Sequence, residues 1–335
     1  MVSPNKISNK VTHLVQRFHG LEARGYTSVI VEIVMICLAF ILVLNRFCVR
    51  FHIGQKPGLD DYVILASLAF CIAMNAVNIA AIHYGYGKYT WEVSKDDMCI
   101  ALKLFYCLQI LYKCTINLTK ISIVLLYRRI FETTKFRFPY ICDCIIGVVA
   151  AYALVSIIVT LFECAPMARV WDRSIPGACI NFTAFWYMNA AWNISTDLLI
   201  FLLPMPLIHT LSLPTRSKIG LTAVFAMGLF VCATSILRMK SLDVSSKSPD
   251  PSHGTLISTM WTTIEANTGI ICACLPMLRI PLAQILEYLS SWYRQLLSVK
   301  VKESSTTMRV RNSPKDNTKR DKPFTGWIKG NRTNK

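Results

Sequence analysis

The stretch YTSVIVEIVMICLAFILVLNRFC, residues 26–48, decides the fold class of this chain. Only Glu32 and Arg46 are charged within it, and a helix that crosses a bilayer needs roughly 20 predominantly apolar residues. The run is too long for the core of a signal peptide and has no small-residue cleavage site after it. We therefore interpret it as a membrane helix that the protein retains.

Six more apolar runs follow, and each predicts a further span. Apolar residues make up 53% of the 335-residue chain and charged residues 16%, whereas soluble domains carry about 25% charged residues. This composition excludes an ordinary soluble enzyme, a disordered or fibrous chain, and a compact disulfide scaffold. The sequence predicts an all-α, seven-transmembrane helix bundle with spans at residues 26–48, 60–83, 99–126, 140–163, 183–206, 219–240 and 257–280.

Lys and Arg are concentrated on one side of this predicted bundle. If the N-terminus is outside, most of the 36 Lys and Arg lie in the cytoplasmic loops and the C-terminal tail, which predicts an N-out, C-in orientation. The net charge of +17 then has a topological meaning, and no nucleic-acid partner is expected. We expect four segments: an outer N-terminus with a short amphipathic helix (1–25), the membrane domain (26–280), an interfacial amphipathic helix (281–297) and a disordered basic tail (298–335).

Basic residues on the predicted inner face are candidates for contact with a cytoplasmic partner. They are Arg128, Arg129, Arg216 and Lys218. An acidic protein surface or lipid headgroups would suit them, although the topological role of basic loops explains them equally well.

The 13 cysteines fall mostly inside apolar runs, where they are expected to pack as small hydrophobic residues. No pair of CxxC motifs is present, so no metal site is expected. Three cysteines lie on the predicted outer face, where oxidising conditions allow a disulfide. We favour Cys99–Cys179, with Cys164–Cys179 as the alternative. Asn181-Phe-Thr183 forms a glycosylation sequon close to the membrane.

Polar residues form a stripe on one face of the third span. Lys113, Asn117 and Lys120 are spaced by three or four residues. Charged groups inside a bilayer are costly, so they usually have partners. Asp197, in the fifth span with Asn193, has the depth to pair with Lys113 or Lys120. Such a pair would fix helix packing, form the polar floor of a ligand pocket, or handle protons.

Glu32 and Glu265 lie nearer the outer ends of their spans and predict an outer cavity. Trp261 and Arg238 are further candidates for its lining. Residues 257–280 contain no Lys that could form a Schiff base, so retinal is not expected, and no other cofactor or catalytic residue is assigned.

Several separated motifs resemble those of the fungal rhodopsin-like domain family, which includes fungus-specific seven-helix receptors and satratoxin-cluster membrane proteins. The resemblance covers about residues 26–285. The motifs include Gly58-Leu-Asp60-Asp61-Tyr62, Leu118-Thr-Lys120-Ile-Ser122, Tyr127-Arg-Arg129-Ile-Phe131, Gly177-Ala-Cys179, Asn193-Ile-Ser-Thr-Asp197 and Cys274-Leu-Pro276.

This resemblance implies a multi-pass protein of the plasma membrane or an endomembrane. The leading hypothesis is a receptor or sensor that binds a small ligand from the outer side, in some members within fungal secondary metabolism. The alternative is a cyclase-like membrane enzyme that uses an intramembrane Asp or Glu. A G protein is one candidate partner, but Tyr127 stands where animal receptors carry an acid before the Arg, which argues against that coupling.

Overall fold

The computed structural model describes backbone and side chains for most of the chain up to residue 277. The described ranges are 4–88, 91, 93–131, 137–172, 174–205, 230, 233–240, 256–277 and 291–292, with only the backbone for 4–26. Contacts divide the chain into two units, Met1–Pro281 and Leu282–Lys335. In the second unit the structure describes only Ser291 and Trp292, both helical. The predicted segments 281–297 and 298–335 therefore lie almost wholly outside the described residues.

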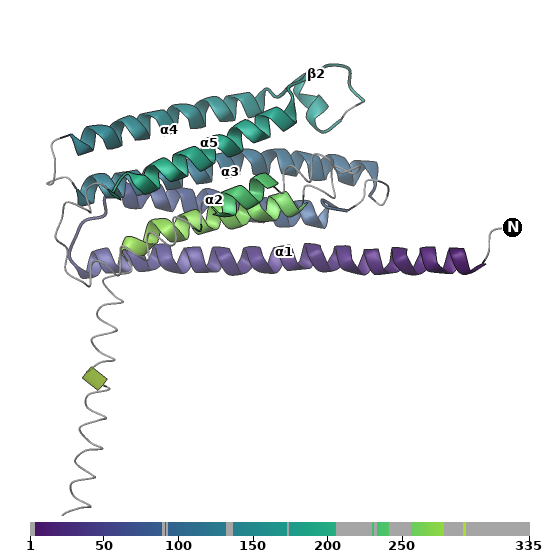
Figure 1. The fold of residues 1–335 in the computed structure, drawn as a ribbon, viewed down its shortest axis with the longest axis horizontal. Coiled ribbons are helices and arrows are strands. Elements are labelled where there is room, and N and C mark those ends of the chain that lie inside the picture. Colours follow the sequence, from purple (N-terminus) through teal and green to yellow (C-terminus); the bar gives the residue numbers. More distant parts are fainter. Residues whose placement is uncertain are drawn as a thin grey trace, which may run out of the picture. The chain divides into compact units, whose positions relative to one another are not determined.

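Helices make up nearly all of the described part of the first unit (Figure 1). They are α1 (Pro4–His52), α2 (Leu59–His83), α3 (Lys95–Ile130), α4 (Phe138–Leu161) and α5 (Phe182–Leu202). Residues 233–240 and 256–277 are also helical and belong to the sixth and seventh predicted spans.

Four described helices are long and apolar enough to cross a membrane: Thr27–His52, Leu59–His83, Lys95–Ile130 and Phe138–Leu161. An all-α membrane bundle is thus what the structure supports, while the seven-span count and the orientation stay predictions. We expected a separate short helix within residues 1–25, but from Pro4 onward the backbone is helical and continuous with the first span in α1.

Charge and capping at the helix ends agree with the helix dipole. Asp60 and Asp61 lie in the first turn of α2, and Arg128 and Arg129 lie in the last turn of α3. The Gly58 amide at the N-cap of α2 donates to Asp61 Oδ2 over 2.9 Å. These residues mark the helix ends in the sequence itself.

Helix α3 lies at the centre of the packing, in contact with α2, α4 and α5, and α1 packs on α2. Ala39, Val43, Ile64 and Ile270 belong to one core cluster. The Ser67 hydroxyl donates to the Thr115 carbonyl oxygen over 2.9 Å, joining α2 to α3. Small and hydroxylated residues at such contacts let membrane helices approach closely.

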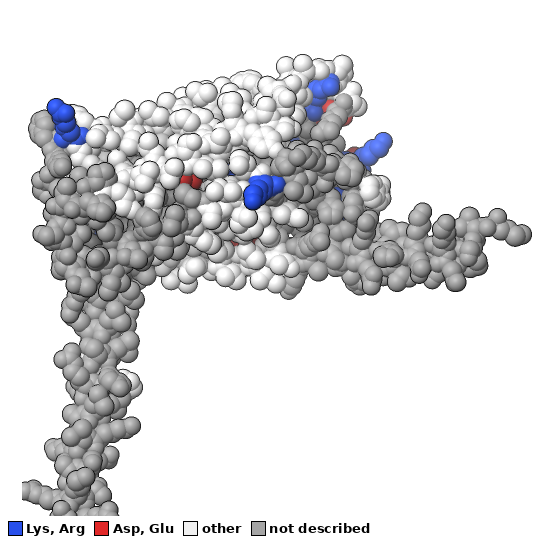
Figure 2. All heavy atoms as spheres, in the orientation of Figure 1, with Lys and Arg blue, Asp and Glu red and all other residues white. Residues whose placement is uncertain are grey.

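The outward sides of these helices are apolar. Val34 and Ile41 of α1 and Leu154 and Val155 of α4 are all more than half exposed. The described part of the face in Figure 2 accordingly carries few charged side chains. A surface of this kind fits contact with lipid tails.

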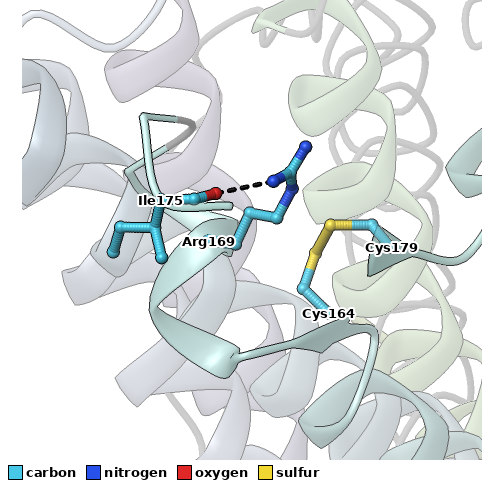
Figure 3. Close-up of a disulfide and its surroundings, with 4 residues drawn as sticks. All are labelled: Cys164, Arg169, Ile175 and Cys179. Atoms are coloured by element: carbon cyan, nitrogen blue, oxygen red, sulfur yellow. Dashed lines mark hydrogen bonds between the residues drawn. A yellow bond between two sulfur atoms is a disulfide. The ribbon is translucent and has the colours of Figure 1, made fainter. Parts of the chain in front are cut away.

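A short hairpin follows α4 and carries the disulfide (Figure 3). Strands β1 (Cys164–Ala165) and β2 (Ala178–Cys179) pair antiparallel, so Cys164 faces Cys179, and η1 (Met167–Val170) lies between them. The bond joins Cys164 to Cys179. A Cβ at Gly177 would lie 2.3 Å from the Ala165 carbonyl oxygen, so the close strand approach requires glycine there.

The favoured Cys99–Cys179 bridge was therefore wrong, and the alternative holds. Cys99 is a free thiol, and its Sγ lies 3.7 Å from the Trp171 carbonyl oxygen. The backbone pairing of β1 with β2 brings two cysteines together that are close in the sequence. Such a two-residue strand pair has no hydrophobic periodicity from which it could be predicted.

Candidate functional site

A cavity lies among α3, α4, α5 and the helical stretches 233–240 and 256–277, toward the hairpin end of the bundle. We call it the proximal cavity. It is lined by Phe105, Leu108, Gln109, Tyr112, Lys113, Ile116, Asn117, Tyr152, Ser156, Trp186, Asn189, Asn193, Arg238, Ser258, Thr259 and Thr262. The lining thus combines aromatic rings with amides and hydroxyls, and its charged members are both cations.

A second cavity, the distal cavity, lies toward the opposite ends of α3 and α5. It is lined by Ile116, Thr119, Lys120, Ile123, Leu126, Tyr127, Asp197, Ile200, Phe201, Gly269, Cys272, Ala273 and Pro276. Asp197 is the acidic residue in this lining, so the two cavities differ in the charge that they present.

A closed ring of polar side chains lies between the two cavities. Its members come from α3, α5 and the helical stretches 233–240 and 256–277, and they are Tyr112, Lys120, Asn193, Asp197, Ser235 and Glu265. The carboxylates of Asp197 and Glu265 are balanced by Lys120 and by Arg238, which flanks the ring.

The contacts run from one member of the ring to the next. The Asn193 Nδ2 donates to the Tyr112 hydroxyl over 3.1 Å, and that hydroxyl donates to Glu265 Oε2 over 2.8 Å. Ser235 Oγ lies 2.5 Å from Glu265 Oε1 and 3.3 Å from Asp197 Oδ2, with a single hydroxyl proton to share between them. The ring therefore links four helical segments through hydrogen bonds that depend on one another.

Lys120 is the lysine that pairs with Asp197. Its Nζ lies 3.1 Å from Asp197 Oδ1, and the two side chains are only 4% and 9% exposed. The same Nζ donates to Thr196 Oγ1 over 2.6 Å and to Asn193 Oδ1 over 3.2 Å, which closes the ring. Of the two partners that the sequence left open, the structure chooses Lys120.

Lys113 is held differently, against α4. Its Nζ donates to the Ser156 carbonyl oxygen over 3.0 Å and to the Thr160 hydroxyl, and it lies 4.4 Å from the centre of the Phe185 ring. Among the described residues, no Asp or Glu comes within ion-pair distance of it. Asn117, one turn further along α3, donates to the Lys113 carbonyl oxygen over 2.7 Å, while its own Oδ1 has no hydrogen-bond partner within the described part of the chain.

Only two of the four residues predicted to line an outer cavity, Arg238 and Glu265, are brought together. Arg238 lines the proximal cavity, and Glu265 lies behind it, 2.8 Å from Arg238 Nε. Glu32 lies elsewhere, between α1 and α2, where Ser28 and Asn78 donate to its Oε1. Trp261 is half-buried and lines neither cavity.

A charge cluster that the sequence reasoning missed lies at the end of the bundle away from the hairpin. It consists of Arg46, Arg50, Asp60, Asp61 and Arg129. Arg46 contacts Asp60 at 2.6 Å and Asp61 at 2.8 Å, and Arg50 contacts the same two residues at 2.5 and 2.7 Å. Its signal in the sequence was a pair of adjacent acids in the first turn of a span.

This cluster also ties helices together. Arg46 Nη1 donates to the Ala273 carbonyl oxygen over 2.7 Å, which joins α1 to the helical stretch 256–277. Arg129, one of the predicted cytoplasmic contacts, reaches Asp60 at 3.2 Å and is 35% exposed. Arg128 instead pairs with Asp143 in an exposed contact, and Arg216 and Lys218 lie outside the described residues.

Asn181 has a structural role besides its place in the sequon. Its Oδ1 accepts a hydrogen bond from the Ala184 amide over 3.1 Å and so caps α5. Within the part of the chain that the structure describes, no group of three or more His, Cys, Asp or Glu is placed to hold a metal ion.

Comparison with known proteins places these features in a family context. Residues 45–284 match the fungal rhodopsin domain. A SAT4 family membrane protein of Emericella nidulans is 34% identical over 203 residues, which is 60% of this chain and 51% of the relative.

Two further relatives carry functional names. The polyenoic acids biosynthesis gene cluster protein Ba17b of Metarhizium anisopliae is 25% identical over 79% of this chain and 76% of its own length. Receptor GIN3 of Arthrobotrys oligospora is 25% identical over 65% of this chain and 53% of its own length. The chain thus spans about half the length of the SAT4 family protein and of the receptor.

Proposed function

This chain belongs to the fungal rhodopsin domain family, and from that premise we propose that it is a receptor-like seven-helix membrane protein that binds a small molecule in the proximal cavity. The observation that carries the proposal is the position of this cavity directly against the polar ring. A ligand that contacts both Tyr112 and Asn193 touches two members of the ring and so acts on the segments that the ring joins.

The hairpin supports the predicted sidedness of the site. The Cys164–Cys179 disulfide needs an oxidising compartment, which the outer or lumenal side supplies. The proximal cavity lies toward this end, so the ligand would enter from the outer side. The Arg46–Asp60–Asp61 cluster would then lie at the cytoplasmic end, as the predicted N-out orientation requires.

The names of relatives support two parts of the proposal. One relative is named a receptor, and another belongs to a biosynthesis gene cluster. We therefore place this protein's ligand among the small molecules of fungal secondary metabolism.

Ligand-induced stabilisation of the purified chain in lipid nanodiscs tests the proposal. An organic extract of fungal metabolites should raise the thermal midpoint of the wild-type protein, because binding to the native state shifts the unfolding equilibrium. Thr262→Trp fills the cavity and should abolish this shift, whereas Ile257→Trp, at a 41% exposed position of the same helix, should keep it. An equal shift in both variants would refute binding in the proximal cavity.

A membrane enzyme is the second candidate, and Asp197 is the residue that favours it. This acid lines the distal cavity, while Glu265 is enclosed by Tyr112, Ser235 and Arg238. Incubation with a polyprenyl or polyketide intermediate separates the two candidates. A product that forms with the wild type and not with Asp197→Asn would establish the enzyme, and the receptor proposal requires that none forms.

A further inference from the structure

We propose that the proximal cavity selects small molecules that carry a carboxylate, which Arg238 and Lys113 bind through charge-assisted hydrogen bonds. This inference rests on the proposed function and adds the chemical class of the ligand. It starts from the charge of the lining, which contains two cations and no Asp or Glu.

Arg238 brings an unused donor to the cavity. The residue is 6% exposed, its Nε faces Glu265 Oε2 at 2.8 Å, and its Nη2 has no hydrogen-bond partner among the described residues. A buried guanidinium nitrogen without an acceptor is costly, because it has lost its water and gained nothing in exchange. A ligand oxygen at this position would supply the missing acceptor.

Lys113 supplies the second charge. It is 7% exposed and donates to two neutral oxygens, the Ser156 carbonyl and the Thr160 hydroxyl, while the buried Glu163 acts on it electrostatically without a direct ion pair. Neutral acceptors leave the charge of a buried ammonium only partly compensated. An anion in the cavity would compensate it, and the gain is larger than in water because the surroundings are of low dielectric constant.

The rest of the lining fits the body of such a molecule. Trp186 and Tyr152 offer ring faces, and Tyr152 is stacked on Trp192 with ring centres 4.2 Å apart. Asn117 Oδ1, which accepts no hydrogen bond from any residue that the structure describes, offers an acceptor for a hydroxyl or amide group of the ligand. An unsaturated or aromatic acid matches this combination of cations, rings and one free acceptor.

Matched acid and amide probes test the inference on the purified full chain in phosphatidylcholine nanodiscs. The soluble pair is trans-cinnamate and trans-cinnamamide, and the membrane-borne pair is oleate and oleamide. We expect at least one acid to bind tighter than its amide by tenfold or more, as measured by titration of the thermal midpoint. The pair that shows the difference tells whether the acid arrives from solution or from the bilayer.

Three variants connect the selectivity to the two cations. Lys113→Gln, which still donates toward α4, and the double variant Arg238→Gln with Glu265→Gln, which keeps the ring neutral, should each lose at least tenfold in acid affinity. Lys103→Gln, an exposed lysine on the same helix that lies 5.5 Å from the Trp171 ring, should bind as the wild type does. Loss in the first two variants with retention in the third supports the inference.

The contrary outcomes are distinct from a failure of the proposed function. If acids show no advantage over amides, or if neither cation variant changes the preference, the carboxylate inference is overturned. The receptor proposal would still stand if the metabolite extract stabilised the wild type and not Thr262→Trp. If the extract also failed, both would fall.

Discussion

Removing the carboxylate of Asp197 should destabilise the protein by leaving Lys120 buried without its counter-ion. At the observed 3.1 Å separation, Coulomb's law with an effective dielectric constant of 20 gives an attraction of about 5 kcal/mol. Much of this is offset, because Lys120 keeps Thr196 and Asn193 as neutral acceptors. Polar contacts in membrane proteins also measure less than in soluble ones, so we expect Asp197→Leu to cost about 2 kcal/mol.

A double-mutant cycle separates the Lys120–Asp197 interaction from the other contacts that each side chain makes. The combination of Lys120→Met with Asp197→Leu should be more stable than the sum of the single effects by about 1 kcal/mol, since it strands no charge. Lys113→Met is the matched control, because Lys113 lies on the same face of α3 and bonds to α4 instead. Its effect should add to that of Asp197→Leu within about 0.5 kcal/mol.

The measurement is equilibrium unfolding of the purified variants in mixed micelles, followed by tryptophan fluorescence. A coupling of zero between positions 120 and 197 would refute the ion pair as a stabilising contact. A coupling with position 113 as large as that with position 120 would show that the pairing in solution differs from the one described. Either result would also remove the Lys120–Asp197 link from the polar ring, and the proposed function depends on that ring.

Other expectations are simpler to check. Non-reducing peptide mapping should recover a Cys164–Cys179 linked peptide, and Cys164→Ser should cost about 2–5 kcal/mol, the usual loss for a native bridge, so recovery of free Cys164 would contradict the structure. In unfolding experiments Asp61→Asn should cost at least about 3 kcal/mol, because Asp61 is buried among arginines, whereas Asp143→Asn, 48% exposed in its pair, should cost less than about 1 kcal/mol. A C-terminal tag should be accessible only after the membrane is permeabilised, and labelling of intact cells would overturn the N-out orientation.

The interior of the bundle shows where sequence reasoning stopped. Spacing alone placed Lys113, Asn117 and Lys120 on one face of α3, and in the structure the two lysine side chains contact neighbouring helices. It did not say which lysine meets Asp197, because the two lie two turns apart and the tilt and offset of membrane helices are set by packing. Lys113 contacts α4 and Lys120 contacts α5. Which of these helices lies beside α3 at a given depth in the bundle is not visible in the spacing of the residues.

The Arg–Asp cluster and the disulfide could not be predicted from the sequence either, because both depend on contacts between separate segments. Arg129 was interpreted as a basic residue of the inner face, and nothing local indicates that three arginines from two helices converge on Asp60 and Asp61. The bridge depended on a two-residue strand pair that is too short to leave a pattern.

By itself the sequence determined that this chain is a helical membrane protein, and it located the four long apolar helices among the described residues to within a few residues. Hydropathy suffices for this because a bilayer forces each crossing segment to satisfy its own backbone hydrogen bonds, which makes the span a local property of the chain. Only the tertiary structure decided which charges meet, which cysteines join, and that a polar ring separates two cavities. These features depend on the rotation and offset of helices around one another, and those are fixed by side-chain packing between segments far apart in the sequence.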